Sequence, residues 1–60
     1  MFQKAVVREK ATGLVVYTTK ECTEHFENIF GEIVIRVGVM QKMYYSMKDY
    51  WVDFYSLPNR

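Results

Sequence analysis

The sequence predicts a small α+β domain, and three observations support this fold class. Residues 33–39 alternate with the two-residue period of a β-strand. Residues 18–31 combine a helix-capping pattern with apolar residues at helical spacing. Residues 40–56 carry a second apolar stripe at the spacing of one helix face. The predicted order of elements is ββαβα, in a single domain that spans residues 1–60.

The first two strands are predicted to form a hairpin. Residues 2–9 alternate imperfectly, so this strand is expected to bury one face only in part. Residues 10–13 form the loop, because Gly13 can adopt the left-handed conformation of a tight turn without steric cost. Residues 14–18 are rich in β-branched and aromatic side chains and complete the hairpin.

A helix is predicted for residues 18–31. The Thr18 hydroxyl can cap its first turn, and Glu21, three residues later, can reach back in a capping box. Gly31 ends the helix as a C-terminal cap. The predicted apolar face consists of Cys22, His25, Phe26, Ile29 and Phe30, and the predicted acidic face consists of Glu21, Glu24 and Glu27.

The third strand, residues 33–39, is predicted to return beside the first. This pairing gives a three-stranded antiparallel sheet of order 2-1-3, with the helix covering one face. Gly38 lies inside the strand pattern and is expected to mark a bulge or a bend into the C-terminal segment.

A C-terminal amphipathic helix is predicted for residues 40–56. Its apolar stripe consists of Met40, Met43, Tyr44, Met47, Tyr50, Trp51 and Phe54. The alternative is a C-terminal β-hairpin that turns at residues 47–49, because residues 50–55 are rich in strand formers. The helix is preferred because a strand would leave large apolar side chains on both of its faces. Pro58 and Asn59 are expected to close the ordered region.

Length and composition restrict the classes of function. Sixty residues form a small domain of marginal stability, and the single cysteine, Cys22, excludes an internal disulfide. Eight basic and seven acidic residues give a net charge of +1, which provides no strong field toward nucleic acid or anionic lipid. The N-terminus does not resemble a signal peptide, and no apolar run approaches the ~20 residues of a membrane span. A cytoplasmic protein without a membrane partner is expected.

Catalytic, metal and cofactor sites are not predicted. Cys22 and His25 lie three residues apart and provide half of the four ligands that a structural zinc site requires. The same pair has no third group to orient it as a nucleophile and base, so core packing is the preferred interpretation. Asp49 and Asp53 are interpreted as part of a solvated face rather than as an acid and base pair. The isolated glycines form no phosphate-binding loop.

The preferred function is a non-enzymatic protein-interaction module. The C-terminal stripe exceeds what a three-stranded sheet can cover, and surplus apolar area on a small protein marks an interface. The expected partner is a larger protein, with a homodimer as a further expectation. By composition the chain is typical of small accessory regulators and inhibitors, such as phage-encoded inhibitors of host enzymes or defences, and antitoxins. The expected partner-binding residues are Tyr45, Trp51, Val52 and Tyr55.

The alternative function is the binding of single-stranded nucleic acid. Lys42, Tyr44 and Lys48 would carry it, because bases stack on exposed rings and cations contact phosphates. Nucleic acid is the less favoured partner, since Asp49 and Asp53 stand within the aromatic stretch. Rings at helical spacing also belong more often to a core than to a stacking platform.

Overall fold

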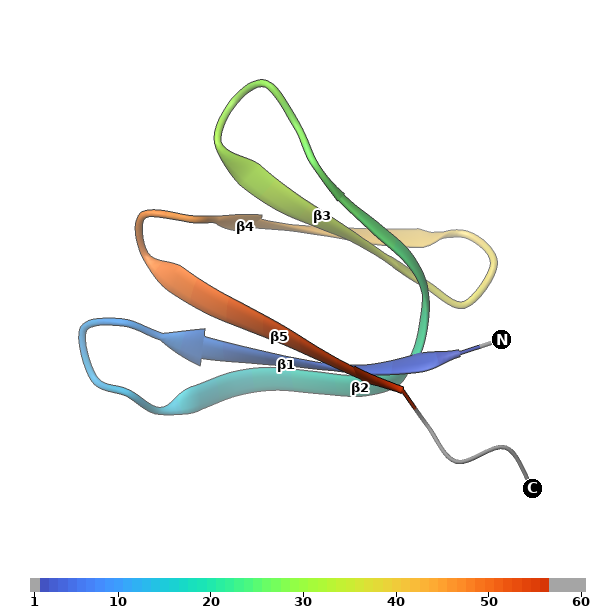
Figure 1. Cartoon of the computed structure of the whole chain (residues 1–60), viewed down its shortest axis with the longest axis horizontal. Coiled ribbons are helices and arrows are strands. Elements are labelled where there is room, and N and C mark those ends of the chain that lie inside the picture. The colour runs from blue at the N-terminus through green and yellow to red at the C-terminus, as the bar shows by residue number, and fades with distance from the viewer. Residues whose placement is uncertain (1, 57–60) are drawn as a thin grey trace.

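Five β-strands form one antiparallel sheet in the computed structural model, which describes residues 2–56 (Figure 1). The strands are β1 (Gln3–Glu9), β2 (Val15–Glu27), β3 (Glu32–Val37), β4 (Gln41–Ser46) and β5 (Tyr50–Ser56). Their order in the sheet is β4-β3-β2-β1-β5. The chain therefore meanders from β1 to β4, and its last strand crosses to the free side of β1. β4 and β5 are the two edge strands although they follow each other in the sequence.

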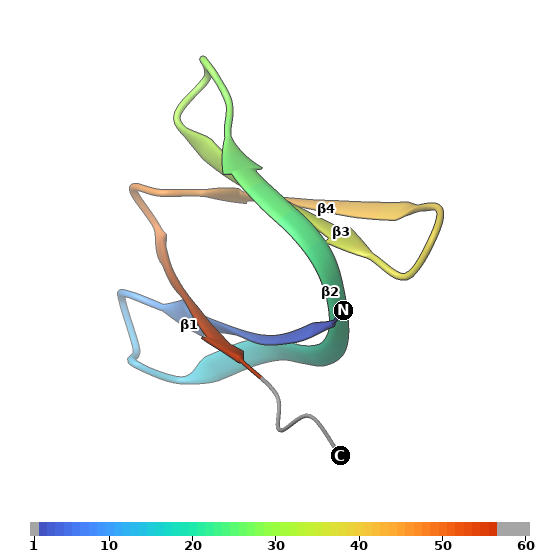
Figure 2. The ribbon, with the colours of Figure 1, turned by 45° about the vertical axis from the view of Figure 1, so that its right-hand side comes forward.

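The long strand β2 connects the two halves of the sheet. Its first part, from Val15 to Cys22, pairs with β1, and its last part, from Cys22 to Glu27, pairs with β3. Figures 1 and 2 show β2 curving strongly between these two parts. The sheet therefore folds over on itself, and its inner face encloses the core.

The core lies on this inner face. Ala5 and Val7 from β1, Cys22 from β2, and Ile35 and Val37 from β3 form a cluster in which no residue is more than 8% exposed. The partly buried side chains packed against it are Tyr17, Ile33, Met43, Tyr45, Tyr50, Val52 and Phe54. The cluster is small, as expected for a chain of this length.

The predicted helix at residues 18–31 is wrong, because these residues form most of β2 and the turn into β3. The inner-face positions of β2 are Tyr17, Thr19, Cys22 and His25, which are spaced by two, three and three residues. One extra residue is inserted in β2 at each of two register shifts, on either side of Cys22. These bulges convert the two-residue period of a strand into a spacing that resembles a helix. The capping pattern, worth about 1 kcal/mol, is outweighed by pairing on both sides of the strand.

The predicted C-terminal helix at residues 40–56 is also wrong. The segment forms β4 and β5, separated by a turn at residues 47–49. The alternative, a hairpin that turns at these residues, is wrong in its pairing: β4 pairs with β3 and β5 pairs with β1. The helix was preferred because strands would carry large apolar side chains on both faces. The strands do carry them on both faces, and several on the outer face remain exposed.

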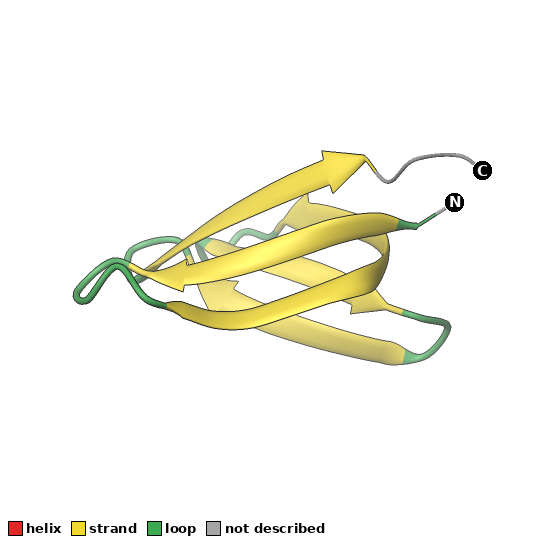
Figure 3. Ribbon diagram, turned by 90° about the horizontal axis from the view of Figure 1, so that it is seen from below, coloured by secondary structure: helices red, strands yellow, loops and turns green. Residues whose placement is uncertain are grey.

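The α+β class and the sheet order 2-1-3 are therefore corrected to a five-stranded all-β sheet. Figure 3 shows only strands and loops in the described part of the chain. The third strand was predicted to lie beside β1. In the structure β3 pairs with β2, and β5 lies beside β1. Gly38 does mark the expected bend, with a φ of 66°. Pro58 and Asn59 lie outside the described residues.

Candidate interaction surface

Exposed apolar side chains outnumber buried ones in the part of the chain that the structure describes. Six apolar residues are buried, whereas twelve large apolar residues are exposed. Two hairpin turns carry the most exposed of them, which are Ile29, Phe30, Val39 and Met40. The aromatic members on the outer face of the sheet are Phe26, Tyr44, Trp51 and Tyr55. The candidate functional surface is therefore sought on the outer face and not inside the sheet.

One group of side chains on β1 and β5 forms the outer β5 surface, which we define as Lys4, Arg8, Trp51, Asp53 and Tyr55. Strand alternation places these residues opposite to the inner-face residues of the same strands. Arg8 is the cross-strand neighbour of Trp51, and Lys4 is the cross-strand neighbour of Tyr55. Trp51 and Tyr55 are 50% and 53% exposed. Two half-exposed rings, each beside a cation, thus flank a single carboxylate.

The charges of the outer β5 surface are open to a partner. Asp53 is exposed, and no described cation lies within 4.0 Å of its carboxylate. Its cross-strand neighbour on β1 is the uncharged Val6. A third cation, the ammonium group of Lys10, lies 6.0 Å from the centroid of the Trp51 ring, within the range of a cation–π interaction. The surface presents both signs of charge around its rings.

The expected partner-binding residues are divided between the two faces of the sheet. Trp51 and Tyr55 lie on the outer face, whereas Tyr45 and Val52 pack against the core on the inner face. The Tyr45 ring contacts the Tyr50 ring edge-on, with a centroid distance of 5.4 Å. Burial raises the pKa of the Tyr45 phenol, and the neighbouring tyrosines add to this rise. Tyr45 and Val52 therefore contribute to packing, and only Trp51 and Tyr55 remain together on a surface.

Sequence reasoning missed Asp53 and the two β1 cations as members of this surface. Trp51, Asp53 and Tyr55 are spaced by two residues, which places them on one face of a strand. This spacing has no such meaning in a helix, so the predicted helix left Asp53 apart from the two rings. The cations could not be found in this way, because only the pairing of β1 with β5 brings Lys4 and Arg8 beside the rings.

A second aromatic group lies on the outer face of β2, β3 and β4. Phe26, Val34 and Tyr44 are cross-strand neighbours in one row. Val34 is buried at 1% exposure, although it lies on the opposite face from the core residues beside it in β3. The two rings are partly exposed. Part of their surface is thus used to cover Val34.

The residues expected to bind nucleic acid are only partly brought together. Lys42 and Tyr44 share the outer face of β4, and Arg36 is the cross-strand neighbour of Lys42. The guanidinium Nε of Arg36 lies 3.4 Å from Glu24 Oε1, which offsets one of these positive charges. Lys48 lies apart from them, in the turn between β4 and β5.

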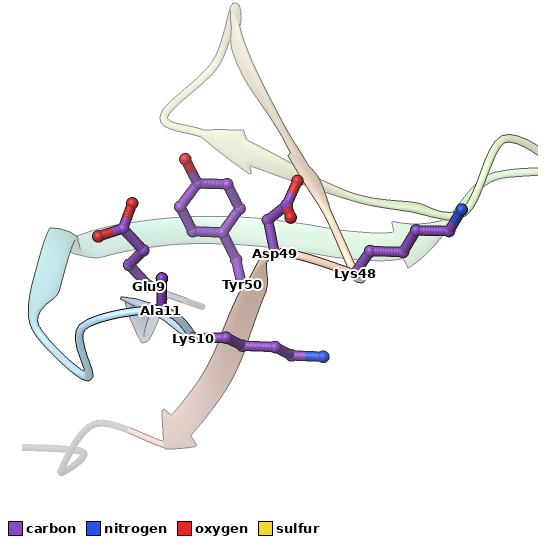
Figure 4. Close-up of a pocket in the computed structure, with 6 residues that line it drawn as sticks. All are labelled: Glu9, Lys10, Ala11, Lys48, Asp49 and Tyr50. Carbon is purple, nitrogen blue, oxygen red and sulfur yellow. The ribbon is translucent and has the colours of Figure 1, made fainter.

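A depression of about 480 Å³ lies between the β1–β2 loop and the β4–β5 turn, lined by Glu9, Lys10, Ala11, Lys48, Asp49 and Tyr50 (Figure 4). The Lys10 backbone N–H donates to the Asp49 carbonyl at 2.9 Å, and its ammonium donates to the Met47 carbonyl at 2.7 Å. Lys10 thus joins the loop to the turn. Figure 4 shows the ammonium groups of Lys10 and Lys48 extending away from the Tyr50 ring, so the charges do not converge on one point.

Cys22 and His25 both occupy inner positions of β2 but have separate surroundings. Cys22 is fully buried, and its thiol donates to the Glu24 carbonyl at 3.6 Å. The His25 ring stacks on Phe54, with centroids 3.6 Å apart and planes 8° from parallel. Among the described residues, no three or more His, Cys, Asp or Glu side chains gather in a way that could hold a metal ion.

Cys22 is expected to react slowly with iodoacetamide in the folded protein. Burial raises the pKa of its thiol, although the hydrogen bond to the Glu24 carbonyl acts in the opposite direction. Because the thiolate is the reactive form, alkylation at mildly alkaline pH should be at least about tenfold slower than in urea. The raised pKa also predicts that the free energy of unfolding decreases as the pH rises above the ordinary thiol range, since the unfolded chain loses its proton first. Equal alkylation rates with and without urea would contradict the buried position.

No protein-family model, no curated protein and no solved structure matches this chain. The described residues, 2–56, contain no helix with the length and apolar character that crossing a membrane requires.

Proposed function

We propose that this protein is a non-enzymatic interaction module that docks on a larger protein through the outer β5 surface. The observation that supports this proposal is the position of Trp51 and Tyr55, which stand half exposed on one face of an edge strand. Only six apolar residues are buried within residues 2–56, yet these two large rings lie outside the core, although their burial would stabilise the fold. Trp and Tyr are enriched among the residues that dominate binding energy at protein interfaces.

The charges of this surface are of both signs, unlike the uniformly basic face of a typical nucleic-acid site. Lys4 and Arg8 lie beside the rings, but Asp53 stands between them and would repel phosphate groups. A matching partner surface has an apolar patch for the rings and groups of both charge signs around it. In this proposal the chain acts in the cytoplasm as a small regulator or inhibitor, of the phage accessory or antitoxin type, and requires neither a cofactor nor a metal.

Affinity capture from a cell lysate tests the proposal, with and without nuclease treatment. We expect one larger protein to be recovered in near-stoichiometric amount and to be insensitive to nuclease. Trp51→Ala and Tyr55→Ala should each reduce its recovery by about tenfold or more, because truncation of an interface anchor typically costs over 1 kcal/mol. Tyr44→Ala is the matched control, since Tyr44 has similar exposure (55%) on the opposite edge strand.

Melting curves of Trp51→Ala and Tyr55→Ala should resemble that of the unmodified protein, because these rings are half exposed. Tyr44→Ala also uncovers part of Val34 and should lose some stability, so capture is compared at a temperature at which all three variants are folded. Recovery that is unaffected by both Trp51→Ala and Tyr55→Ala would contradict the proposed docking surface.

Single-stranded nucleic acid binding is kept as a second candidate because Lys42 and Tyr44 share one face of β4 beside Phe26 and Arg36. This function predicts affinity for an oligonucleotide that falls steeply with salt concentration. It also predicts a loss of affinity in Lys42→Ala and Tyr44→Ala, whereas Trp51→Ala should retain binding. The Tyr44→Ala variant therefore distinguishes the two functions.

A further inference from the structure

We infer that the partner contributes an extended strand that pairs with the free edge of β5, and that this strand carries a basic residue opposite Asp53. The inference rests on the proposed function, because it describes how the outer β5 surface would be used. Strand addition of this kind obtains affinity from backbone hydrogen bonds and specificity from alternate side chains.

The free edge of β5 is regular over its whole length. All seven residues of β5 pair with β1 in an unbroken register, from Gln3 with Ser56 to Glu9 with Tyr50. On its other side β5 has no strand partner among the described residues. Figures 1 and 2 both show β5 leaving the turn at an angle to β4 and running beside β1. A straight strand with unpaired backbone groups is a template for a further strand.

The other free edges are less suited to accept a strand. Within residues 2–56, the first part of β2 has no ladder partner on the side away from β1, but register shifts interrupt it near both of its ends. Bulges of this kind twist an edge and discourage pairing. β4 is regular but one residue shorter than β5, and its outer ring, Tyr44, already covers the buried Val34.

The backbone of β5 shows which residues face the free edge. In an antiparallel ladder, alternate residues direct both N–H and C=O toward the same neighbour. The Lys10 N–H donates to the Asp49 carbonyl at 2.9 Å, so Asp49 faces β1 and every second residue after it does the same. The residues that direct their backbone groups away from β1 are Tyr50, Val52, Phe54 and Ser56.

This alternation brings the outer β5 side chains close to an added strand. Trp51, Asp53 and Tyr55 would occupy the positions without backbone hydrogen bonds to that strand, where opposite side chains approach most closely. Opposite charges directly across two strands stabilise the pair, and like charges destabilise it. A complementary strand therefore has an apolar residue opposite each ring and a Lys or Arg opposite the Asp53 carboxylate, which no cation among residues 2–56 approaches within 4.0 Å.

The same carboxylate disfavours a second copy of this chain as the occupant. Full antiparallel overlap of two β5 strands places Asp53 of one copy opposite Asp53 of the other. Inward and central charges on edge strands are a common means by which proteins avoid pairing with themselves. The charge pattern therefore assigns this edge to a different chain with a basic centre.

A synthetic peptide provides the test. The probe is the acetylated and amidated peptide Thr-Tyr-Thr-Lys-Thr-Tyr-Thr, and its control has Glu in place of Lys. Each is titrated to millimolar concentration into the isotopically labelled full chain, and amide hydrogen exchange is followed by NMR. We expect the lysine peptide to slow exchange at Tyr50, Val52 and Phe54. The glutamate peptide should bind about three- to fivefold more weakly, as expected for one cross-strand charge pair.

Charge reversal makes the test specific. Asp53→Lys should reverse the preference between the two peptides, whereas Lys42→Glu on the opposite edge strand should leave it unchanged. The inference is overturned if neither peptide protects β5, if protection appears at β4 instead, or if the chain alone protects β5 as its concentration rises. If Trp51→Ala reduces protein capture but no peptide protects β5, the proposed function stands and strand pairing fails. If a peptide protects β5 while capture is unaffected by both Trp51→Ala and Tyr55→Ala, strand pairing stands and the proposed docking function fails.

Discussion

Ile35→Ala is expected to unfold much of the protein under conditions in which the unmodified chain is folded. Ile35 is fully buried in the core cluster, on a strand that pairs with β2 on one side and β4 on the other. Removal of three carbon atoms from such a site costs about 2–5 kcal/mol, through lost burial and the cavity that remains. A domain of this size has a total stability of roughly 3–5 kcal/mol. Urea unfolding followed by circular dichroism measures the change.

Ile29→Ala is the matched control, because it removes the same atoms from a side chain that is 93% exposed in the β2–β3 turn. Its effect on the free energy of unfolding should stay within about 0.5 kcal/mol. Equal losses of stability in the two variants would contradict the placement of the core on the inner face.

Asn28→Ala is expected to lower the free energy of unfolding by about 2 kcal/mol. The Asn28 side chain organises the turn between β2 and β3 through three hydrogen bonds. Its Oδ1 accepts from the Phe30 N–H at 2.9 Å and the Glu32 N–H at 3.0 Å, and its Nδ2 donates to Glu32 Oε1 at 2.9 Å. In the alanine variant, the Phe30 N–H, the Glu32 N–H and the Glu32 carboxylate each lose a hydrogen-bond partner. Urea unfolding, with amide exchange at Phe30 and Glu32, measures the loss.

Asn28→Asp separates the contributions of these hydrogen bonds. The carboxylate retains an acceptor for the two N–H groups but loses the donor and repels the Glu32 carboxylate. We expect a loss of stability near neutral pH that is smaller than the loss in Asn28→Ala, because two of the three hydrogen bonds are retained. A turn that is as stable in Asn28→Ala as in the unmodified chain would show that these bonds contribute nothing.

Both predictions concern the framework that positions the outer β5 surface. β1 lies between β5 and β2, and β2 joins β1 to the strand that carries Ile35. The register between β1 and β5 sets the distance from Trp51 to Tyr55 and the placement of Lys4 and Arg8 beside them. A loss of core packing would therefore also weaken the proposed interface, so binding tests require variants whose melting curves are unchanged.

Several local features were predictable from the sequence. The first strand, the turn that contains Gly13 and the strand that contains Ile35 were all found, because glycine and strict alternation act within a few residues. Gly31 was predicted to cap a helix, and this prediction is wrong: it lies in the turn between β2 and β3, where its φ is 77°. Of the four residues predicted to bind a partner, Trp51 and Tyr55 are exposed, whereas Tyr45 and Val52 pack against the core.

The turns that contain Gly13 and Gly38, a surplus of large apolar side chains over what a small core can bury, and a net charge of +1 follow from the sequence alone. The turn between β4 and β5, and the strands formed by residues 18–27, 41–46 and 50–56, depend on the tertiary structure, as does the choice of which side chains face inward. Apolar spacing in these segments is compatible with a helix because bulges and a turn interrupt the strand period. The choice depends on backbone pairing with strands that are distant in the sequence. Such pairing leaves no local signal, and the same pairing brings the charged side chains of β1 beside the rings of β5.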